Sequence, residues 1–375
     1  MTLHELLRDC VTHDASDLHL APGQPPCLRI HGILTPQTQR GIMTPQIIDA
    51  LAEELMRGFD RDGLKRTGSV DGALTAPDGS RFRFNVFRRQ NLLGVALRKL
   101  EERFRSLSEL GLPDHLYHLC DLPDGLVVVC GPTGAGKSTT LATLLDRVNQ
   151  SRRCHMITIE DPIEYIHKPA QSLVSQRQIG ADASSFNDAL VASLRQDPDV
   201  ILVGEIRDLN TIRTAITAAE TGHLVFTTVH AGDTVGAIER LVSVFPADEQ
   251  PGIRRQLAMV LKAIIAQHLL VADGPAAVKT VNGQTTRRGR VAVSEVLTVT
   301  GAVANLIATG KSNQIYSSLE TGTGVGMQTL EADLARLWVG NLISENTALT
   351  MARNPGIVRD RAALLRKPQP RAGVR

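Results

Sequence analysis

Residues 131–138 read GPTGAGKS, which fits the phosphate-binding pattern G-x-x-x-x-G-K-[ST], the P-loop. Glycines in such a loop let the backbone turn tightly, so that successive N–H groups point at phosphate oxygens. Lys137 is expected to reach the β- and γ-phosphates of ATP, and the Ser138 hydroxyl is expected to ligate Mg²⁺. The residues expected to bind ATP are Gly131, Pro132, Thr133, Gly134, Ala135, Gly136, Lys137, Ser138 and Thr139.

The segments on both sides of this loop are those that the motif requires. Residues 126–130 form an apolar run typical of a buried strand, and residues 139–145 have the composition of a helix. The N-terminus of that helix adds the positive end of its dipole to the phosphate site. Strand, glycine loop and helix together indicate a nucleoside triphosphatase, but they do not indicate what its energy is used for.

Two acids follow predicted strands further along the chain. Glu160 comes directly after residues 155–159, and Glu205 comes after residues 200–203. In a parallel sheet, functional residues gather at the carboxyl ends of the strands. We expect Glu205 to polarise the attacking water and Glu160 to orient water or to hold Mg²⁺ through water. The alternatives are a surface acid for Glu205 and a turn-capping acid for Glu160.

Two histidines bracket the next predicted strand, residues 224–229. His223 precedes this strand and His230 follows it. A lone histidine is usually structural, so the residues alone leave open whether either senses the γ-phosphate.

Residues 1–100 have the pattern of a small α+β domain. Stretches 69–74, 80–87 and 93–100 alternate apolar and polar residues, which is typical of an antiparallel meander. Arg83 and Arg98 lie within it among apolar neighbours. Their simplest interpretation is the solvated face of a sheet.

The remainder of the chain is predicted to be α/β, with strands alternating with helices and covered on both faces. Residues 250–270 are expected to form one long helix, residues 273–289 an exposed loop, and residues from 302 onward short helices. The predicted division is 1–100 N-terminal domain, 101–113 linker, 114–300 ATPase domain, 301–358 helical C-terminal subdomain and 359–375 basic, disordered tail.

Composition argues against several other classes of protein. The 41 basic and 39 acidic residues nearly cancel and aromatic residues make up 3%, so neither charge nor stacking indicates nucleic-acid binding. The five cysteines lack C-x-x-C spacing, which disfavours a zinc site and fits reduced thiols in the cytoplasm. The N-terminus lacks a signal-peptide pattern, and no apolar run is long enough to span a membrane.

At this point the chain resembles the secretion and pilus motor ATPases of the GspE/PulE type, most closely the PilT-like type IV pilus retraction ATPases. The P-loop and five further blocks carry the resemblance. They are ASDLHL at 15–20, IEDPIEY at 159–165, LRQDPDVILVGEIRD at 194–208, TGHLVFTTVH at 221–230 and GMQTL at 326–330.

The resemblance implies a PAS-like N-terminal domain, a RecA-like ATPase domain and a homohexameric ring with ATP at subunit boundaries. It implies that Arg83 and Arg98 reach the phosphates and that Glu160 and Glu205 are catalytic acids. It also makes His223 and His230 required site residues. The expected partners are an inner-membrane pilus platform protein, and a paralogous ATPase as a further candidate, with no nucleic acid. The expected location is the cytoplasmic face of the inner membrane, with membrane contact only through the partner.

Differences from known motifs indicate which branch of the secretion and pilus motor ATPases the chain resembles. Pilus-assembly and type II secretion ATPases carry a longer N-terminal region and a four-cysteine zinc motif, and this sequence has neither. The retraction ATPases have an A-I-R-N-L-I-R-E helix, whereas residues 302–309 here read AVANLIAT. A pilus retraction motor, which supports twitching motility, is therefore the leading interpretation. An accessory PilU-like or secretion-type subunit is the alternative, and a nucleic-acid translocase is a weaker one.

Overall fold

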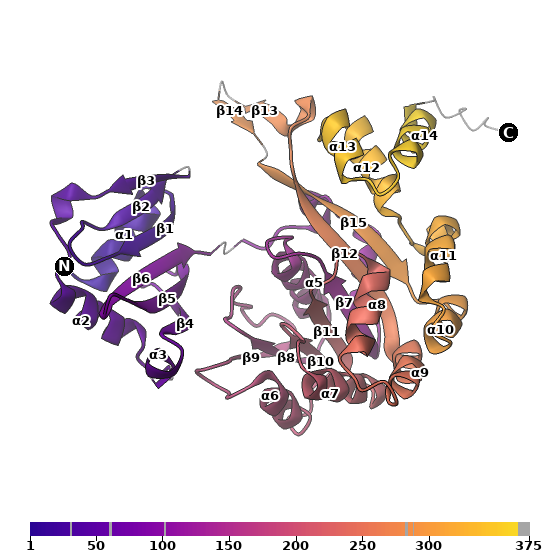
Figure 1. The fold of residues 1–375 in the computed structure, drawn as a ribbon, viewed down its shortest axis with the longest axis horizontal. Coiled ribbons are helices and arrows are strands. Elements are labelled where there is room, and N and C mark those ends of the chain that lie inside the picture. The colour runs from indigo at the N-terminus through magenta and orange to yellow at the C-terminus, as the bar shows by residue number, and fades with distance from the viewer. Residues whose placement is uncertain (31, 60–61, 101–102, 282–283, 288, 367–375) are drawn as a thin grey trace. The chain divides into compact units, whose positions relative to one another are not determined.

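The computed structural model describes residues 1–30, 32–59, 62–100, 103–281, 284–287 and 289–366. Figure 1 shows the elements of the chain, and the contacts within the structure divide it into two compact units. Unit 1 comprises Met1–Arg103 and His155–Asp197, and unit 2 comprises Phe104–Cys154 and Pro198–Arg375.

The first part of unit 1 is a six-stranded sheet with the order β3-β2-β1-β6-β5-β4. Each adjacent pair of its strands is antiparallel. The elements are α1 Leu3–Thr12, β1 Ala15–Leu20, β2 Cys27–Ile30, β3 Ile33–Pro36, α2 Pro45–Leu55, α3 Asp62–Arg66, β4 Ser69–Thr75, β5 Arg81–Arg89 and β6 Leu92–Lys99. The predicted meander at 69–100 is confirmed.

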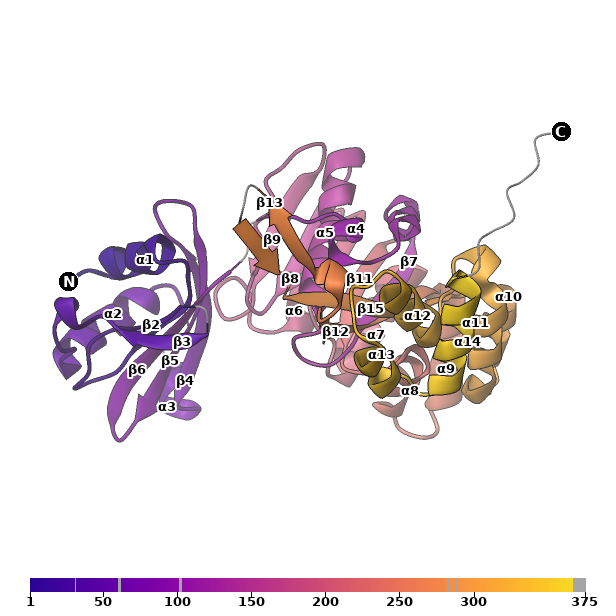
Figure 2. The same ribbon diagram turned by 90° about the horizontal axis from the view of Figure 1, so that it is seen from above.

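The two faces of this sheet differ because side chains alternate along each strand. Phe82, Phe84 and Val86 of β5 are buried in a core that α1 and α2 share. Figure 2 shows both helices on the same side of the sheet. Arg83 and Asn85 therefore project from the opposite face.

Unit 1 also contains the segment after residue 154. It consists of β8 His155–Glu160, β9 Leu173–Gln178 and α6 Phe186–Ser193. Strands β8 and β9 pair in parallel, with Glu160 opposite Gln178. The sequence pattern predicted β8 but not β9, whose residues are mostly polar.

Unit 2 contains five consecutively paired strands in the order β15-β12-β7-β11-β10. Strands β7, β11, β10 and β12 run parallel, and β15 is antiparallel to β12. The strands are β7 Gly125–Cys130, β10 Val200–Val203, β11 Leu224–Val229, β12 Leu261–Val271, β13 Val278–Val281, β14 Gln284–Arg287 and β15 Arg290–Thr298. The helices are α4 Leu107–Leu110, α5 Lys137–Ser151, α7 Leu209–Glu220, α8 Thr234–Ser243, α9 Gln250–Val260, α10 Gly301–Ala308, α11 Ile315–Thr321, α12 Leu330–Val339, α13 Glu345–Met351 and α14 Pro355–Arg366.

Strands β7, β10 and β11 are buried at every position. Runs such as GLVVVC and LVFTTV are almost entirely apolar because helices cover both faces of a parallel sheet, and the two threonines of β11 are buried with their hydroxyls hydrogen-bonded. Parallel strands end at a common edge, so the loops after β7, β10 and β11 lie together. This edge positions the P-loop, Glu205 and His230. The alternation of parallel strands and helices confirms the predicted α/β fold class.

The prediction of one helix over residues 250–270 is wrong. Helix α9 ends at Val260, and Leu261–Val271 forms β12 between β7 and β15. A buried strand is apolar on both faces, so its continuous run also satisfies the helical spacing that residues 257–269 display. The β-branched pair Ile264 and Ile265 and the burial on both sides favour the strand.

The C-terminal part differs from the sequence prediction in two places. Helix α14 extends to Arg366, so residues 359–366 are not a disordered tail; Val358 and Ala362 are buried and Arg366 lies over the Trp338 ring, 4.5 Å from its centroid. Helices α12, α13 and α14 pack into one group in Figures 1 and 2. Strands β13 and β14 occupy part of the stretch expected to be a loop. Residues 367–375 lie outside the described residues.

Among the described residues, no helix is both long enough and apolar enough to cross a bilayer.

Candidate functional site

The P-loop links β7 to α5 and is shaped by its glycines. Gly131, Gly134 and Gly136 have φ of +151°, +80° and +88°, values that favour glycine. Gly136 is the N-cap of α5, so the first N–H groups of this helix open onto the loop. Pro132, Thr133 and Gly134 are exposed, and the backbone between two buried anchors, Gly131 and Ala135, faces solvent. Such a loop fits a phosphate group.

The two side chains expected to touch the nucleotide lie at the start of α5. The Lys137 ammonium donates to the carbonyl oxygens of Gly131 at 2.9 Å and Pro132 at 3.1 Å. Burial lowers the pKa of Lys137, and the Glu205 carboxylate opposes that shift. Ser138 is exposed on the first turn. Both groups are thus at the helix end where anions bind.

Glu205 follows β10 and has two basic neighbours. Arg207 Nη2 donates to Oε2 at 2.6 Å, and His230 Nε2 lies 2.9 Å from Oε1. Burial by itself would raise the pKa of Glu205, but the hydrogen bond and charge of Arg207, with His230 and Lys137, outweigh it and hold the pKa below its usual range. The carboxylate is therefore ionised and can accept a proton from water.

Hydroxyl groups of β11 hold the end of β10 in place. Thr228 Oγ1 donates to the Gly204 carbonyl at 2.7 Å, and Thr227 Oγ1 donates to that of Val203 at 2.8 Å. Both threonines are buried. They connect the backbone before Glu205 to the strand that ends at His230, so the structure brings these two predicted residues together.

His223 lies at the other end of β11 from His230. Its ring Nδ1 contacts the Ala218 carbonyl at 2.8 Å and the Thr221 hydroxyl at 3.2 Å. A strand of six residues separates the two histidines, a length of about 20 Å. Within unit 2 the structure does not bring His223 to the P-loop, and its role in the site stays a prediction.

Glu160 ends β8 in unit 1. Its Oε1 accepts hydrogen bonds from Thr158 Oγ1 at 2.7 Å and Gln176 Nε2 at 3.2 Å. Burial raises the pKa of Glu160 to about 7, although these hydrogen bonds favour the charged form. Part of the side chain still reaches the surface. A carboxyl group that titrates near neutrality is suited to proton transfer.

Arg83 and Arg98 are directly opposite each other on β5 and β6. Like charges at such positions are destabilising, and nearby acids offset them here. Arg98 Nε donates to Asp17 Oδ1 at 2.8 Å, and Arg83 Nη2 lies 3.9 Å from Asp71 Oδ1. The Arg98 side chain is 70% exposed and that of Arg83 is 43% exposed. The structure brings the two arginines together on the open face of the sheet.

One residue of this face was not predicted from the sequence. Arg81, two positions before Arg83, is 9% exposed. It donates to Thr75 Oγ1 at 3.1 Å and to the Ile163 carbonyl at 3.3 Å, three residues after Glu160. Burial lowers the pKa of Arg81, and Glu160 opposes the shift. Arg81 could have been found from the sequence because residues two apart on a strand lie on the same face, so Arg81 shares its face with Arg83.

The family model for type II/IV secretion system proteins matches residues 1–334 of this sequence. The chain is similar to the type IV pilus retraction ATPase PilT of Pseudomonas aeruginosa, with 40% identity over 95% of this chain and 99% of the relative. It is also similar to the type IV pilus ATPase PilU of the same organism, with 37% identity over 94% of this chain and 89% of the relative.

Solved structures give the same result. A crystal structure of the pilus retraction motor PilT with bound ADP has a TM-score of 0.84 and 38% identity, covering 96% of this chain and 99% of that one. The ATPase DotB of Legionella pneumophila has a TM-score of 0.78 and 26% identity, covering 93% and 95%.

Proposed function

Because the chain belongs to the family of type II/IV secretion system proteins, we propose that it is an ATP-hydrolysing motor that drives retraction of a type IV pilus. The resemblance inferred from the sequence motifs is confirmed, as are its ATPase class and nucleotide binding. The observation that carries the proposal is the shared edge of β7, β10 and β11, where the P-loop lies with Glu205 and His230.

The chemistry proposed for this edge is transfer of the γ-phosphoryl group of ATP to water. The water oxygen forms a bond to the γ-phosphorus while the bond from this phosphorus to the ADP oxygen breaks. Glu205 accepts the proton that the water loses. The N–H groups of the P-loop and the Lys137 ammonium stabilise charge on the phosphate oxygens. His230 holds the Glu205 carboxylate in position through their contact of 2.9 Å.

Magnesium dependence is part of the proposal. Mg²⁺ prefers oxygen ligands, and the exposed Ser138 hydroxyl at the P-loop is such a donor. Among the described residues there is no group of three or more His, Cys, Asp and Glu that could hold a metal. Ser138 would hold the ion together with the nucleotide, and Glu160 would be a further ligand through water. The ion would neutralise charge between the β- and γ-phosphates.

We further propose the following assembly. The chain forms a homohexamer on the cytoplasmic face of the membrane, and a pilus platform protein in that membrane receives its motion. Arg83 and Arg98 reach the nucleotide from the PAS-like domain, residues 1–100, and His223 is a required residue of the site. The remaining parts are the linker 101–113, the RecA-like domain 114–300 and a helical subdomain that runs from residue 301 to the end of α14 at Arg366.

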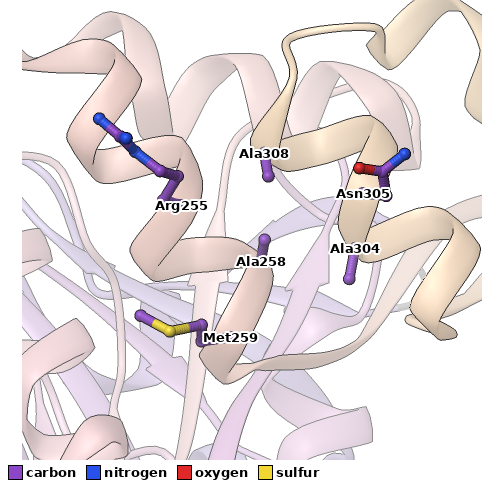
Figure 3. Close-up of a pocket in the computed structure, with 6 residues that line it drawn as sticks. All are labelled: Arg255, Ala258, Met259, Ala304, Asn305 and Ala308. Atoms are coloured by element: carbon purple, nitrogen blue, oxygen red, sulfur yellow. The ribbon is translucent and has the colours of Figure 1, made fainter.

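An accessory, PilU-like subunit is the second candidate, and helix α10 favours it. Positions 304 and 308, which hold arginines in the retraction ATPases, are both alanine here. With Asn305 they line a pocket of about 390 Å³ against Arg255, Ala258 and Met259 of α9 (Figure 3). The side chains that would cover this surface are absent, so coupling to a pilus is the step that needs testing.

The test has two stages. First, ATP hydrolysis by the purified chain is measured over a concentration series, with ring size read by native mass spectrometry. Turnover that rises as hexamers form supports an autonomous motor. Second, the chain is expressed in a host that lacks its retraction ATPase. Restored retraction supports the leading function. Turnover without retraction favours the accessory subunit, and a well-formed ring without turnover contradicts the motor proposal.

A further inference from the structure

Two consecutive residues of β12 contact both sides of the proposed site. Gln267 and His268 lie next to Ala266, which pairs with Cys130 at the end of β7. The P-loop begins at the following residue. Neither side chain belongs to the motifs that identify the nucleotide site, and the sequence pattern placed both in a helix.

The Gln267 amide is 2% exposed and uses both of its ends on the P-loop region. Its Nε2 donates to the Ala135 carbonyl at 2.7 Å, and its Oε1 accepts from Thr140 Oγ1 at 2.7 Å. It therefore links the last turn of the loop to the first turn of α5. Loss of these contacts would leave a buried carbonyl and a buried hydroxyl without this partner, which is more costly than loss of a solvated hydrogen bond.

Two of the loop glycines are packed against the same residue. A Cβ atom added at Gly131 would lie 2.2 Å from the backbone oxygen of Gln267, and one at Gly136 would lie 2.9 Å from its Nε2. A Cβ at Gly134 would meet nothing within 4 Å. Glycine is thus required at position 131 by the backbone of β12 as well as by its φ, and at position 136 by its φ, where a side chain would also displace the Gln267 amide.

His268 contacts the other side of the site. Its ring Nε2 lies 2.9 Å from the Gly232 carbonyl, a contact in which the ring N–H donates. Gly232 follows His230 by two residues and precedes Asp233, the N-cap of α8. His230 directly follows β11, and the chain two residues after it is held by the contact between Gly232 and His268 of β12.

We propose that Gln267 and His268 are positioning residues with separate effects on one reaction. Gln267 fixes the P-loop and sets nucleotide affinity, whereas His268 fixes the segment after His230 and sets turnover. Strand β12 then fixes the position of the P-loop relative to the segment that follows His230. The effect on turnover rests on the proposed ATP hydrolysis, while the effect on affinity needs only nucleotide binding.

The first test compares nucleotide affinity in two glutamine variants. Gln267→Met keeps the side-chain length and removes both hydrogen bonds, and we expect fluorescent ADP to bind on the order of tenfold more weakly. Gln328→Met is the matched control, because Gln328 Nε2 also donates to a backbone carbonyl, that of Ser294 at 3.0 Å, outside the site. We expect ADP affinity within about twofold of the wild type for this control.

Thr140→Val provides a second route if Gln267→Met folds poorly. The two changes remove the same hydrogen bond, so their effects on ADP affinity should be less than additive in a double-mutant cycle. Additive effects, or a loss of thermal stability with unchanged affinity, would overturn the role of Gln267.

The second test separates turnover from affinity. His268→Ala should lower kcat on the order of tenfold with ADP affinity nearly unchanged, and His268→Gln, which keeps a donor, should restore most of the loss. His115→Ala is the control, because His115 Nε2 makes the same kind of contact to Gly326 O at 3.1 Å. It should leave kcat unchanged. A change in affinity equal to the change in kcat would contradict the proposal.

Hydrogen exchange distinguishes this inference from the proposed function. In His268→Ala the amides of residues 231–234 should exchange faster, whether or not the protein hydrolyses ATP. If the wild type shows no turnover, the proposed function fails, and exchange and ADP affinity still decide the inference. Unchanged exchange at these amides would overturn the role of His268 even in an active enzyme.

Discussion

Charged side chains are arranged differently at the β10–β11 edge of unit 2 and on the open sheet face of unit 1. At the edge, Glu205 is 20% exposed and contacts Arg207 at 2.6 Å and His230 at 2.9 Å. On the open face, Arg98 is 70% exposed and Arg83 lies 3.9 Å from its nearest acid. The acid at the edge is mostly buried between two short contacts, whereas the arginines of the open face are exposed, although Arg98 also donates to Asp17 at 2.8 Å.

This difference indicates a division of labour. Groups that must hold a water and a phosphate in a fixed geometry benefit from preorganisation, because rearrangement during the reaction costs free energy. Exposed arginines keep the freedom to bind a phosphate that comes from elsewhere, at the cost of ordering their side chains. We therefore expect changes at the edge to have larger effects than changes on the open face.

The largest effect is expected at the P-loop. Lys137→Ala should lower turnover by on the order of 10³-fold and weaken nucleotide binding, because one charge that faces the phosphates is lost. Steady-state hydrolysis and fluorescent ADP titration measure the two effects. Lys311→Ala, at an exposed position of the same unit, is the control and should change neither. Near-normal turnover in Lys137→Ala would remove the basis for the proposed site.

The arginine pair should come next. Arg83→Ala combined with Arg98→Ala should lower kcat by about 10²-fold, in the way that loss of a charge-stabilising arginine does in other phosphoryl transfer. Thermal stability should change little, because the variant also relieves repulsion between opposed like charges. Arg89→Ala, at the exposed end of β5, is the control. Equal activity of the double variant and the wild type would show that this face takes no part in hydrolysis.

A site residue could be predicted from the sequence when the element that positions it is close to it in the chain. The P-loop and Glu205 were predicted because each lies within a few residues of the strand that positions it, whereas His230 was assigned to the site only by the family resemblance. Gln267 and Arg81 were not, since their partners Ala135 and Ile163 are 132 and 82 residues away. Such contacts depend on tertiary packing. For the same reason β12 was mistaken for a helix, because burial on both faces removes the period that distinguishes the two.

Glu160 should give a pH-dependent effect of intermediate size. Its folded-state pKa of about 7 lies above the ordinary value of 4.5, so the folded state holds its proton more tightly than the unfolded chain. This contribution to stability is present below pH 4.5 and is lost as pH rises through 7.

Glu160→Gln imitates the protonated form and keeps the acceptor for Thr158. Its melting temperature relative to the wild type should therefore rise between pH 5 and pH 8, on the order of a few degrees. Calorimetry at several pH values measures the difference. A difference that stays constant with pH would show that Glu160 does not titrate in this range.

The smallest effect is expected for the acid that holds Arg98. Asp17→Asn should lower the free energy of unfolding by about 1 to 2 kcal/mol, because the Arg98 partner is mostly exposed to water but Asp17 itself is only 7% exposed. Chemical denaturation measures this value. A loss of several kcal/mol would mean that the pair is structural, which would weaken the contrast between the two regions.

The most direct test of the central claim is a side-by-side measurement of ADP binding and ATP turnover in the wild type and in Glu205→Gln. The variant keeps the size of the side chain and removes its ability to accept a proton. We expect Glu205→Gln to bind ADP as tightly as the wild type does and to hydrolyse ATP about 10²- to 10⁴-fold more slowly. Undiminished turnover in Glu205→Gln, with normal binding, would contradict it.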